Sequence, residues 1–104
     1  MRTITRDELR AALGTVTVVD TLGGDYYAQQ HLPGAIPLVE SEVAERAAEL
    51  LPDRHATVVT YCTNPSCPNS KAVAARLTAL GYTDVRRYAE GIEDWVAAGL
   101  PVEP

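Results

Sequence analysis

Phenylalanine is absent from this chain of 104 residues, which also contains a single tryptophan, a single methionine and two histidines. Its core must therefore be built mainly from Val, Leu, Ile and Ala. No segment approaches the run of roughly 20 apolar residues needed to cross a bilayer, and the N-terminal residues lack the apolar stretch of a signal peptide. The sequence thus predicts a protein without membrane association, located in the cytoplasm.

Positive charge is also scarce, since nine Lys and Arg residues face 14 Asp and Glu residues for a formal net charge of -5. A negatively charged protein repels the phosphate backbone of nucleic acids, so we expect no nucleic-acid partner. Arg86 and Arg87 form the densest basic pair. The content of 46% hydrophobic and 22% charged residues is ordinary for a globular protein. The length fits one domain over residues 1–104.

Cysteine occurs only twice, as Cys62 and Cys67. Two cysteines are too few for a disulfide scaffold, and their clustering in one short segment favours a chemical role. A structural zinc site needs four ligands, and the other candidate donors, His31 and His55, lie far away in the sequence. We therefore expect neither a metal nor an organic cofactor.

Hydrophobic periodicity alternates between helix-like and strand-like segments along the chain. Thr5 and Glu8 form a capping box that starts a helix ending at Gly14. Runs of β-branched residues predict strands at residues 15–20, 56–61 and 83–88. Apolar residues at helical spacing predict further helices at residues 25–30, 41–51, 70–80 and 91–98, and Ser70 is the expected N-cap of the helix at 70–80. Alternating strands and helices favour a parallel α/β fold.

The strongest strand signal, residues 56–61, leads directly into Cys62, and a polar loop over residues 63–69 separates this cysteine from the helix at Ser70. This order places a thiol at the carboxyl end of a strand and before a helix N-terminus, where open α/β sheets bind their ligands. Amides and the helix dipole at such a place stabilise a thiolate or an anionic substrate. The alternative is a buried cysteine that acts as a small hydrophobic residue.

Six segments, taken in order, resemble the pattern of the rhodanese-like domain family. They are residues 18–20 (Val-Val-Asp), 31–36 (His-Leu-Pro-Gly-Ala-Ile), 58–62 (Val-Val-Thr-Tyr-Cys), 70–77 (Ser-Lys-Ala-Val-Ala-Ala-Arg-Leu), 81–85 with its Gly-Tyr and Val, and 91–102 with its Trp-x-x-x-Gly-Leu-Pro ending. The resemblance implies a three-layer fold in which helices flank a five-stranded parallel sheet. It also implies a sulfurtransferase with Cys62 as the catalytic residue.

In the implied reaction, the Cys62 thiolate takes the outer sulfur of thiosulfate or of a persulfide donor, and a thiol or cyanide then removes that sulfur. The implied partners are a small sulfur-containing anion or a persulfide donor, and a thiol acceptor that a protein could supply. Asp20 would support the site from the end of the first strand. The implied substrate-binding loop comprises Thr63, Asn64, Pro65, Ser66, Cys67, Pro68, Asn69 and Ser70.

The chain departs from the family pattern in this loop, which is longer than the common form and contains two prolines and a second thiol. It has no Arg or Lys, and the nearest cation is Lys71. Anion binding is therefore expected to rest mainly on backbone amides and the helix end. Pro68 stands six residues after Cys62, where a phosphatase of this fold needs an arginine to clamp phosphate, so phosphatase activity is not expected.

Two alternatives to sulfur transfer remain open. The chain could be a non-catalytic interaction module that uses the rhodanese fold as a binding surface, or Cys62 and Cys67 could form a thiol redox switch. Cys67 could resolve a persulfide on Cys62 by forming a disulfide across four intervening residues, or it could be inert.

Overall fold

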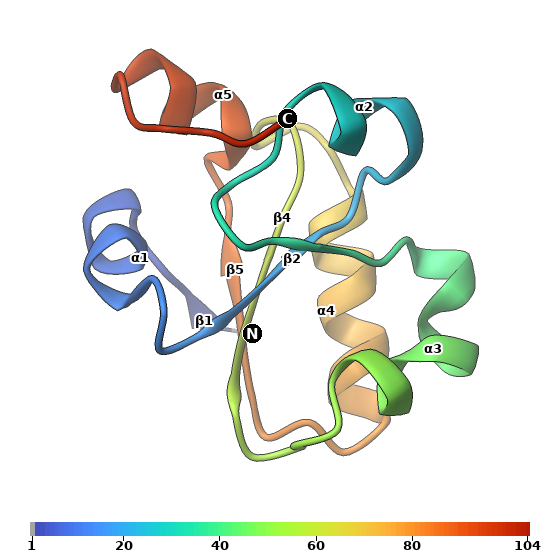
Figure 1. Cartoon of the computed structure of the whole chain (residues 1–104). Coiled ribbons are helices and arrows are strands. Elements are labelled where there is room, and N and C mark those ends of the chain that lie inside the picture. The colour runs from blue at the N-terminus through green and yellow to red at the C-terminus, as the bar shows by residue number, and fades with distance from the viewer. Residues whose placement is uncertain (1) are drawn as a thin grey trace.

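The computed structural model describes residues 2–104 and contains a five-stranded sheet with the strand order β1-β5-β4-β2-β3 (Figure 1). Every neighbouring pair of strands runs parallel. The strands are β1 (Arg2–Thr3), β2 (Thr17–Asp20), β3 (Ile36–Pro37), β4 (Thr57–Tyr61) and β5 (Asp84–Tyr88). The helices are α1 (Arg6–Ala12), α2 (Gly24–Gln29), the 3-10 helix η1 (Glu40–Glu42), α3 (Val43–Leu50), α4 (Asn69–Ala79) and α5 (Gly91–Ala97). This architecture confirms the expected α/β class.

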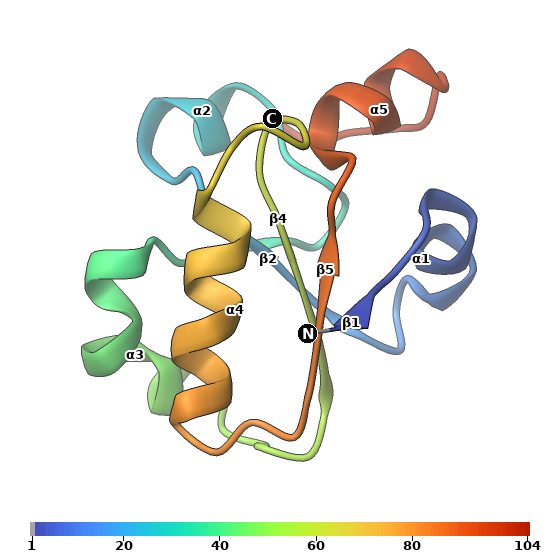
Figure 2. The ribbon, with the colours of Figure 1, turned by 180° about the vertical axis from the view of Figure 1, so that it is seen from behind.

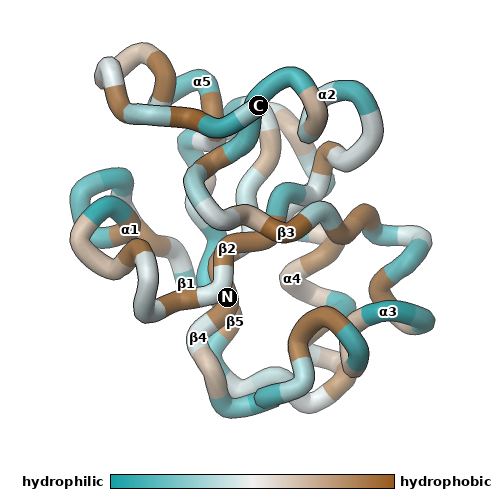
Figure 3. Tube along the Cα trace, viewed as in Figure 1, coloured by the Kyte–Doolittle hydropathy of each residue, from teal (hydrophilic) through white to brown (hydrophobic). Residues whose placement is uncertain are grey.

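Helices cover both faces of the sheet, which confirms the three layers implied by the resemblance (Figures 1 and 2). α3 and α4 lie over one face, where Val19, Val58 and Leu77 belong to one buried cluster. α1 and α5 lie over the other face, where Leu9 and Trp95 are fully buried in a second cluster. The hydrophobic colour follows β2 and β3, whereas hydrophilic residues mark the outer turns of α2 and α3 (Figure 3). The sheet is thus buried on both sides, as parallel sheets usually are.

The three longest-paired strands end level with one another. Asp20, the last residue of β2, is in register with Tyr61 of β4, which is in register with Tyr88 of β5. The segments that follow these strands lead into α2, α4 and α5 respectively. One edge of the molecule therefore gathers the carboxyl ends of the central strands and the beginnings of three helices, the usual place for a ligand site in this fold class.

The expected helices and strands are present, with boundaries that shift by one or two residues. The capping box at the start of α1 is confirmed, because the amide of Glu8 donates to Thr5 Oγ1 at 3.1 Å and the amide of Thr5 donates to Glu8 Oε1 at 2.9 Å. The prediction that Ser70 caps α4 is wrong. The N-cap position is Pro68, and Ser70 lies inside the first turn, where its buried hydroxyl is held by side chains from elsewhere in the fold.

Both outer strands of the sheet are only two residues long. β1 pairs with β5 through Arg2 and Thr3, and β3 pairs with β2 through Ile36 and Pro37. Segments this short carry no periodic signal, so the sequence pattern itself predicts only the three inner strands.

Over residues 2–104, none of the helices has both the length and the apolar character needed to cross a bilayer.

Candidate active site

Cys62 directly follows β4, the central strand, and is 1% exposed. Its carbonyl accepts a hydrogen bond from the amide of Ile92 at 2.9 Å, and the carbonyl of Thr63 accepts one from the amide of Glu93 at 3.0 Å. The first turn of α5 therefore fixes the backbone at the exact point where the chain leaves the sheet. Gly91 permits this close approach, because its φ of +77° and its missing side chain leave room for both carbonyls.

The loop over residues 63–69 folds back towards Cys62. The side chain of Asn64 accepts from the amide of Ser66 at 3.0 Å, and its carbonyl accepts from the amide of Cys67 at 3.1 Å, which closes a tight turn. This turn brings the carbonyl of Cys67 to 3.4 Å from Cys62 Sγ, and the Ser70 hydroxyl lies 3.7 Å from the same sulfur. The structure thus brings the predicted cysteine, the second thiol and Ser70 together.

The two thiols have opposite electrostatic settings. Burial raises the pKa of Cys62, and its hydrogen bond to Cys67 adds to this effect, whereas the amide and hydroxyl of Ser70 act in the opposite direction. Burial also acts to raise the pKa of Cys67, but the hydrogen bond with Cys62, amides of the loop and the charge of Arg87 outweigh it and lower that pKa below its usual value. Cys67 therefore ionises more readily than Cys62.

Arg87 is the residue of this site that the sequence analysis missed. Its guanidinium Nε donates to Ser70 Oγ at 2.9 Å, and its Nη2 reaches the carbonyl of Pro65 at 3.5 Å. Arg87 thus brings to the loop a cation from a distant part of the sequence, in addition to Lys71 in the following helix. A contact between β5 and the start of α4 depends on the sheet order, so the spacing of residues along the chain contains no signal for it. The sequence signal for a cation was the basic pair Arg86 and Arg87, and of these two residues Arg87 is the one that contacts the loop.

Asp20 lies at the end of β2 and is fully buried. Its carboxylate accepts from the amide of Leu22 at 2.8 Å, and it accepts from the hydroxyl of Tyr61 at 2.7 Å. The hydroxyl of Tyr61 in turn accepts from the amide of Leu32 at 3.0 Å. Asp20 therefore orders the turn after β2 and holds Tyr61, the residue before Cys62. Its contacts with the loop are indirect.

Other contacts close the loop on its outer sides. Asn69 Nδ2 donates to the carbonyl of Thr21 at 3.4 Å, and Asn64 Nδ2 lies 3.4 Å from both carboxylate oxygens of Glu93. The loop is thus tied to the turn after β2, to α5 and to β5. These ties come from three elements that are distant in sequence, and together they give the polar loop a defined shape.

A pocket of about 170 Å³ opens beside the start of the loop. Thr63 contributes to its wall next to Cys62, and the exposed ring of Tyr26 borders it from α2. The complete lining is Leu22, Tyr26, Gln29, Gln30, Thr63, Ile92 and Glu93. This pocket offers a second molecule a place of approach at the carboxyl edge of the sheet.

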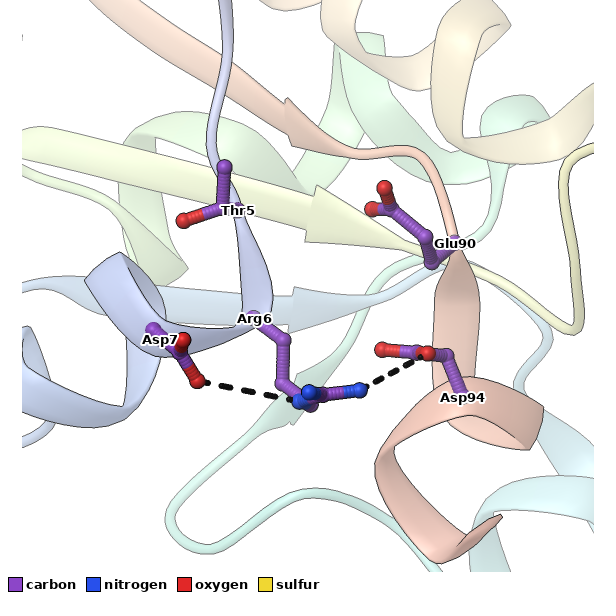
Figure 4. A pocket seen from close by; sticks show the side chains of 5 residues that line it. All are labelled: Thr5, Arg6, Asp7, Glu90 and Asp94. Carbon is purple, nitrogen blue, oxygen red and sulfur yellow. Dashed lines mark hydrogen bonds and ion pairs between the residues drawn. The ribbon is translucent and has the colours of Figure 1, made fainter. Parts of the chain in front are cut away.

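A separate pocket of about 190 Å³ lies between α1 and the beginning of α5 (Figure 4). Arg6 occupies it and forms ion pairs with Asp94 at 3.0 Å and with Asp7 at 3.8 Å. Thr5 and Glu90 complete the lining. The pocket contains no thiol and shares no residue with the loop at 63–70, so its charged groups mainly tie α1 to α5.

His31 is held by structural contacts. Its ring stacks on Tyr27 with centroids 3.9 Å apart, its Nδ1 lies 2.9 Å from the carbonyl of Tyr27, and its backbone pairs with Glu103 in both directions at 2.8 Å. These contacts fasten the C-terminal segment to the turn before β3. The partners of His31 in residues 2–104, Tyr27 and Glu103, lie outside the loop that follows Cys62.

Comparison with known proteins agrees with this geometry. The family model of the rhodanese-like domain matches residues 5–98. The HTH-type transcriptional regulator Rv0324 of Mycobacterium tuberculosis is 39% identical over 102 residues, which are 96% of this chain and 44% of the regulator. The chain thus spans less than half the length of that relative.

Two further similarities concern an enzyme and a solved structure. Thiosulfate sulfurtransferase PspE of Escherichia coli is 37% identical over 76 residues, covering 73% of this chain and 70% of the enzyme. The crystal structure of a rhodanese-related protein from Thermoplasma volcanium superimposes with a TM-score of 0.82 at 24% identity, covering 99% of this chain and 98% of that one. The family match, the fold and the position of Cys62 lead to one conclusion: this chain belongs to the rhodanese-like domain family.

Proposed function

We propose that this protein is a sulfurtransferase that carries a sulfane sulfur on Cys62. The Cys62 thiolate attacks the outer sulfur of thiosulfate, the new S–S bond forms a persulfide, and sulfite leaves with the electron pair of the broken bond. An acceptor thiolate or cyanide then attacks the outer sulfur of the persulfide and regenerates the Cys62 thiolate. A persulfide donor serves in the same way, with its own thiolate as the leaving group.

The observation that carries this proposal is the position of Cys62 Sγ, which lies between the end of the central strand and the first turn of α4 with the Ser70 hydroxyl beside it. α4 is 11 residues long, so its N-terminus contributes a stable positive dipole end. The Ser70 amide also donates to the sulfur and favours its charged form. These groups support a thiolate and then an anionic persulfide at one place.

Arg87 strengthens the case for an anionic donor. The loop itself contains no cation, but the guanidinium of Arg87 reaches Ser70 and Pro65 from β5. Positive charge at the edge of the loop attracts a small anion and favours thiosulfate as well as a persulfide donor. Anion binding then has the support of this charge as well as that of the backbone amides and the helix end.

The pocket beside Thr63 is the place that we assign to the acceptor. It lies next to the residue that follows Cys62, and its wall combines the aromatic ring of Tyr26, the amides of Gln29 and Gln30, and the carboxylate of Glu93. Such a mixed wall suits a thiol on a small molecule or on a partner protein. We place the reaction in the cytoplasm, because an acceptor thiol must stay reduced.

Intact-mass analysis of the reduced protein after treatment with thiosulfate, or with a persulfide donor, tests the proposal. We expect a gain of one sulfur atom that cyanide removes. Because the pKa of Cys62 is raised, the thiol is mostly protonated at neutral pH, and the loading rate should increase about tenfold per pH unit below that pKa. A failure to gain sulfur from any donor at any pH would instead favour the non-catalytic interaction module.

A specific observation favours a second role for Cys67, that of a resolving thiol. Cys62 Sγ lies 3.4 Å from the backbone carbonyl of Cys67, and Cys67 is the thiol that ionises more readily. Its thiolate can attack Sγ of the Cys62 persulfide, form a Cys62–Cys67 disulfide and release hydrosulfide from the broken S–S bond. A dithiol reductant then restores both thiols. This sequence of steps would make the loop a redox switch coupled to sulfur transfer.

The stability of the loaded persulfide distinguishes a resolving Cys67 from an inert one. After removal of excess donor, the wild-type protein is expected to release sulfide and to lose two hydrogen atoms relative to its reduced mass. Cys67→Ser should keep its sulfur under the same conditions, because no second thiolate lies beside the persulfide. Equal persulfide lifetimes in the two proteins, without disulfide formation, would show that Cys67 is inert.

A further inference from the structure

We propose that Arg87 is a positioning residue for the Cys62 thiolate and that it acts through the hydroxyl of Ser70. The inference rests on the proposed function, since it concerns the same sulfur. The observation behind it is a continuous chain of contacts, in which Arg87 Nε lies 2.9 Å from Ser70 Oγ and Ser70 Oγ lies 3.7 Å from Cys62 Sγ.

The direction of the first hydrogen bond determines the direction of the second. A guanidinium has donors and no acceptor, so Arg87 Nε–H must donate to the oxygen of Ser70. The hydroxyl proton of Ser70 is then free to point away from Arg87. While Cys62 is protonated, its S–H donates to Ser70 Oγ; when the sulfur is ionised, the Ser70 O–H donates to it. The Ser70 hydroxyl thus accepts a hydrogen bond from the protonated sulfur and donates one to the ionised sulfur.

The backbone holds Ser70 in the place that this relay needs. Ser70 is 1% exposed, and its carbonyl accepts from Thr60 Oγ1 at 3.0 Å. Thr60 of β4 is in register with Arg87 of β5, so the two residues that hold Ser70 are neighbours across the sheet. A buried hydroxyl fixed in this way loses little entropy when it donates to the thiolate. Without Arg87, the same hydroxyl could rotate towards another acceptor.

The remaining charged groups near Cys62 are bonded to other side chains or exposed to solvent. Asp20 at the end of β2 is bonded to Tyr61, Glu93 of α5 faces Asn64, and Lys71 of α4 is exposed. Cys67 is the titratable group in contact with Cys62. Arg87 therefore supplies the cation that is linked to Cys62 through a hydrogen-bonded side chain.

Arg86 provides a matched control. It is the preceding residue of β5, carries the same charge and donates instead to Asp84 at 3.0 and 3.1 Å. Consecutive residues of a strand point to opposite faces of the sheet, so Arg86 faces away from α4. Replacing either arginine changes the net charge by one unit, but only Arg87→Met breaks the chain to Cys62.

The experiment titrates both thiols by NMR in protein that contains isotopically labelled cysteine, without any sulfur donor. We expect Arg87→Met to raise the midpoint pH of Cys62, whereas Arg86→Met leaves it near the wild-type value. Ser70→Ala should raise the midpoint as well, and adding Arg87→Met to Ser70→Ala should change Cys62 little further. If Arg87→Met does not fold, as its NMR spectrum would reveal, Arg87→Gln replaces it.

The midpoints of the two thiols distinguish an effect through Ser70 from a direct effect of the Arg87 charge. Arg87 also lowers the pKa of Cys67 through its charge, so the Cys67 midpoint should rise in Arg87→Met even when Ser70 is alanine. Equal Cys62 midpoints in Arg86→Met and Arg87→Met, or an undiminished effect of Arg87→Met in the Ser70→Ala background, would overturn the relay.

Sulfur loading is measured separately and should slow about tenfold at neutral pH in Arg87→Met. A protein that takes up no sulfur, but shows the expected midpoints, would contradict the proposed function and leave the relay intact.

Discussion

Replacing Cys62 by serine is expected to abolish the gain of sulfur from thiosulfate and from persulfide donors. A serine hydroxyl does not ionise at neutral pH, so the nucleophile is lost. The fold should persist, because serine is similar in size and its hydroxyl can donate its one proton to the Cys67 carbonyl or to Ser70 Oγ, as the thiol can. Intact-mass analysis after donor treatment, together with a thermal melt, measures both effects.

Cys67→Ser is the matched control for this experiment, since it removes the neighbouring thiol by the same substitution. The hydrogen bond and the charge of Cys67 both raise the pKa of Cys62. Their removal should therefore leave the loading of Cys62 at neutral pH unchanged or make it faster. Sulfur uptake that survives Cys62→Ser and disappears in Cys67→Ser would show that the second cysteine is the sulfur carrier.

Gly91→Ala is expected to produce the largest loss of stability from the addition of a single methyl group. A Cβ at this position would lie 2.5 Å from the carbonyl oxygen of Thr63 and 2.6 Å from that of Cys62, and φ is +77°. The left-handed backbone costs about 1–2 kcal/mol and the clash about 1–3 kcal/mol, so we expect a total loss of about 2–5 kcal/mol in the free energy of unfolding. Urea denaturation measures this loss.

Gly99→Ala separates the two causes, because Gly99 has nearly the same φ, +76°, and a Cβ there meets nothing within 4 Å. It should lose only the conformational part of about 1–2 kcal/mol. Under the proposed function, Gly91→Ala should also slow sulfur loading, since the methyl would displace the carbonyls of Cys62 and Thr63, where the loop begins. Equal losses of stability in the two variants would mean that the backbone at Cys62 yields easily and that α5 does not fix it.

The sequence predicted those parts of the fold that depend on local patterns. The capping box at Thr5 and the β-branched run of β4 each determine a local structure from neighbouring residues. β1 and β3 were missed by the pattern, because a pair of residues has no periodicity and becomes a strand only beside an existing neighbour. Their presence was expected only from the family resemblance.

In the candidate site, too, the sequence predicted what depends on neighbouring residues and missed what depends on tertiary contacts. Cys62 and its loop could be found because strand, thiol and helix are consecutive in the sequence. Arg87 could not, since it lies 17 positions after Ser70 in the sequence and the pairing of β4 with β5 brings the two together. The incorrect assignment of Ser70 as an N-cap has the same origin. A serine near a helix start usually caps it, but here a tertiary contact takes the hydroxyl.

The two-residue outer strands, β1 and β3, also restrict how this domain can meet other chains. A long free edge of a sheet is a template on which a foreign strand can add and from which aggregates can grow. Within residues 2–104, each border of this sheet offers two residues of regular strand, and β3 includes Pro37, which has no amide hydrogen to donate. Under the proposed function, a partner that delivers or collects sulfur would then have to be recognised by side chains around the carboxyl edge, and crowded solutions of this protein should resist fibre formation through its borders.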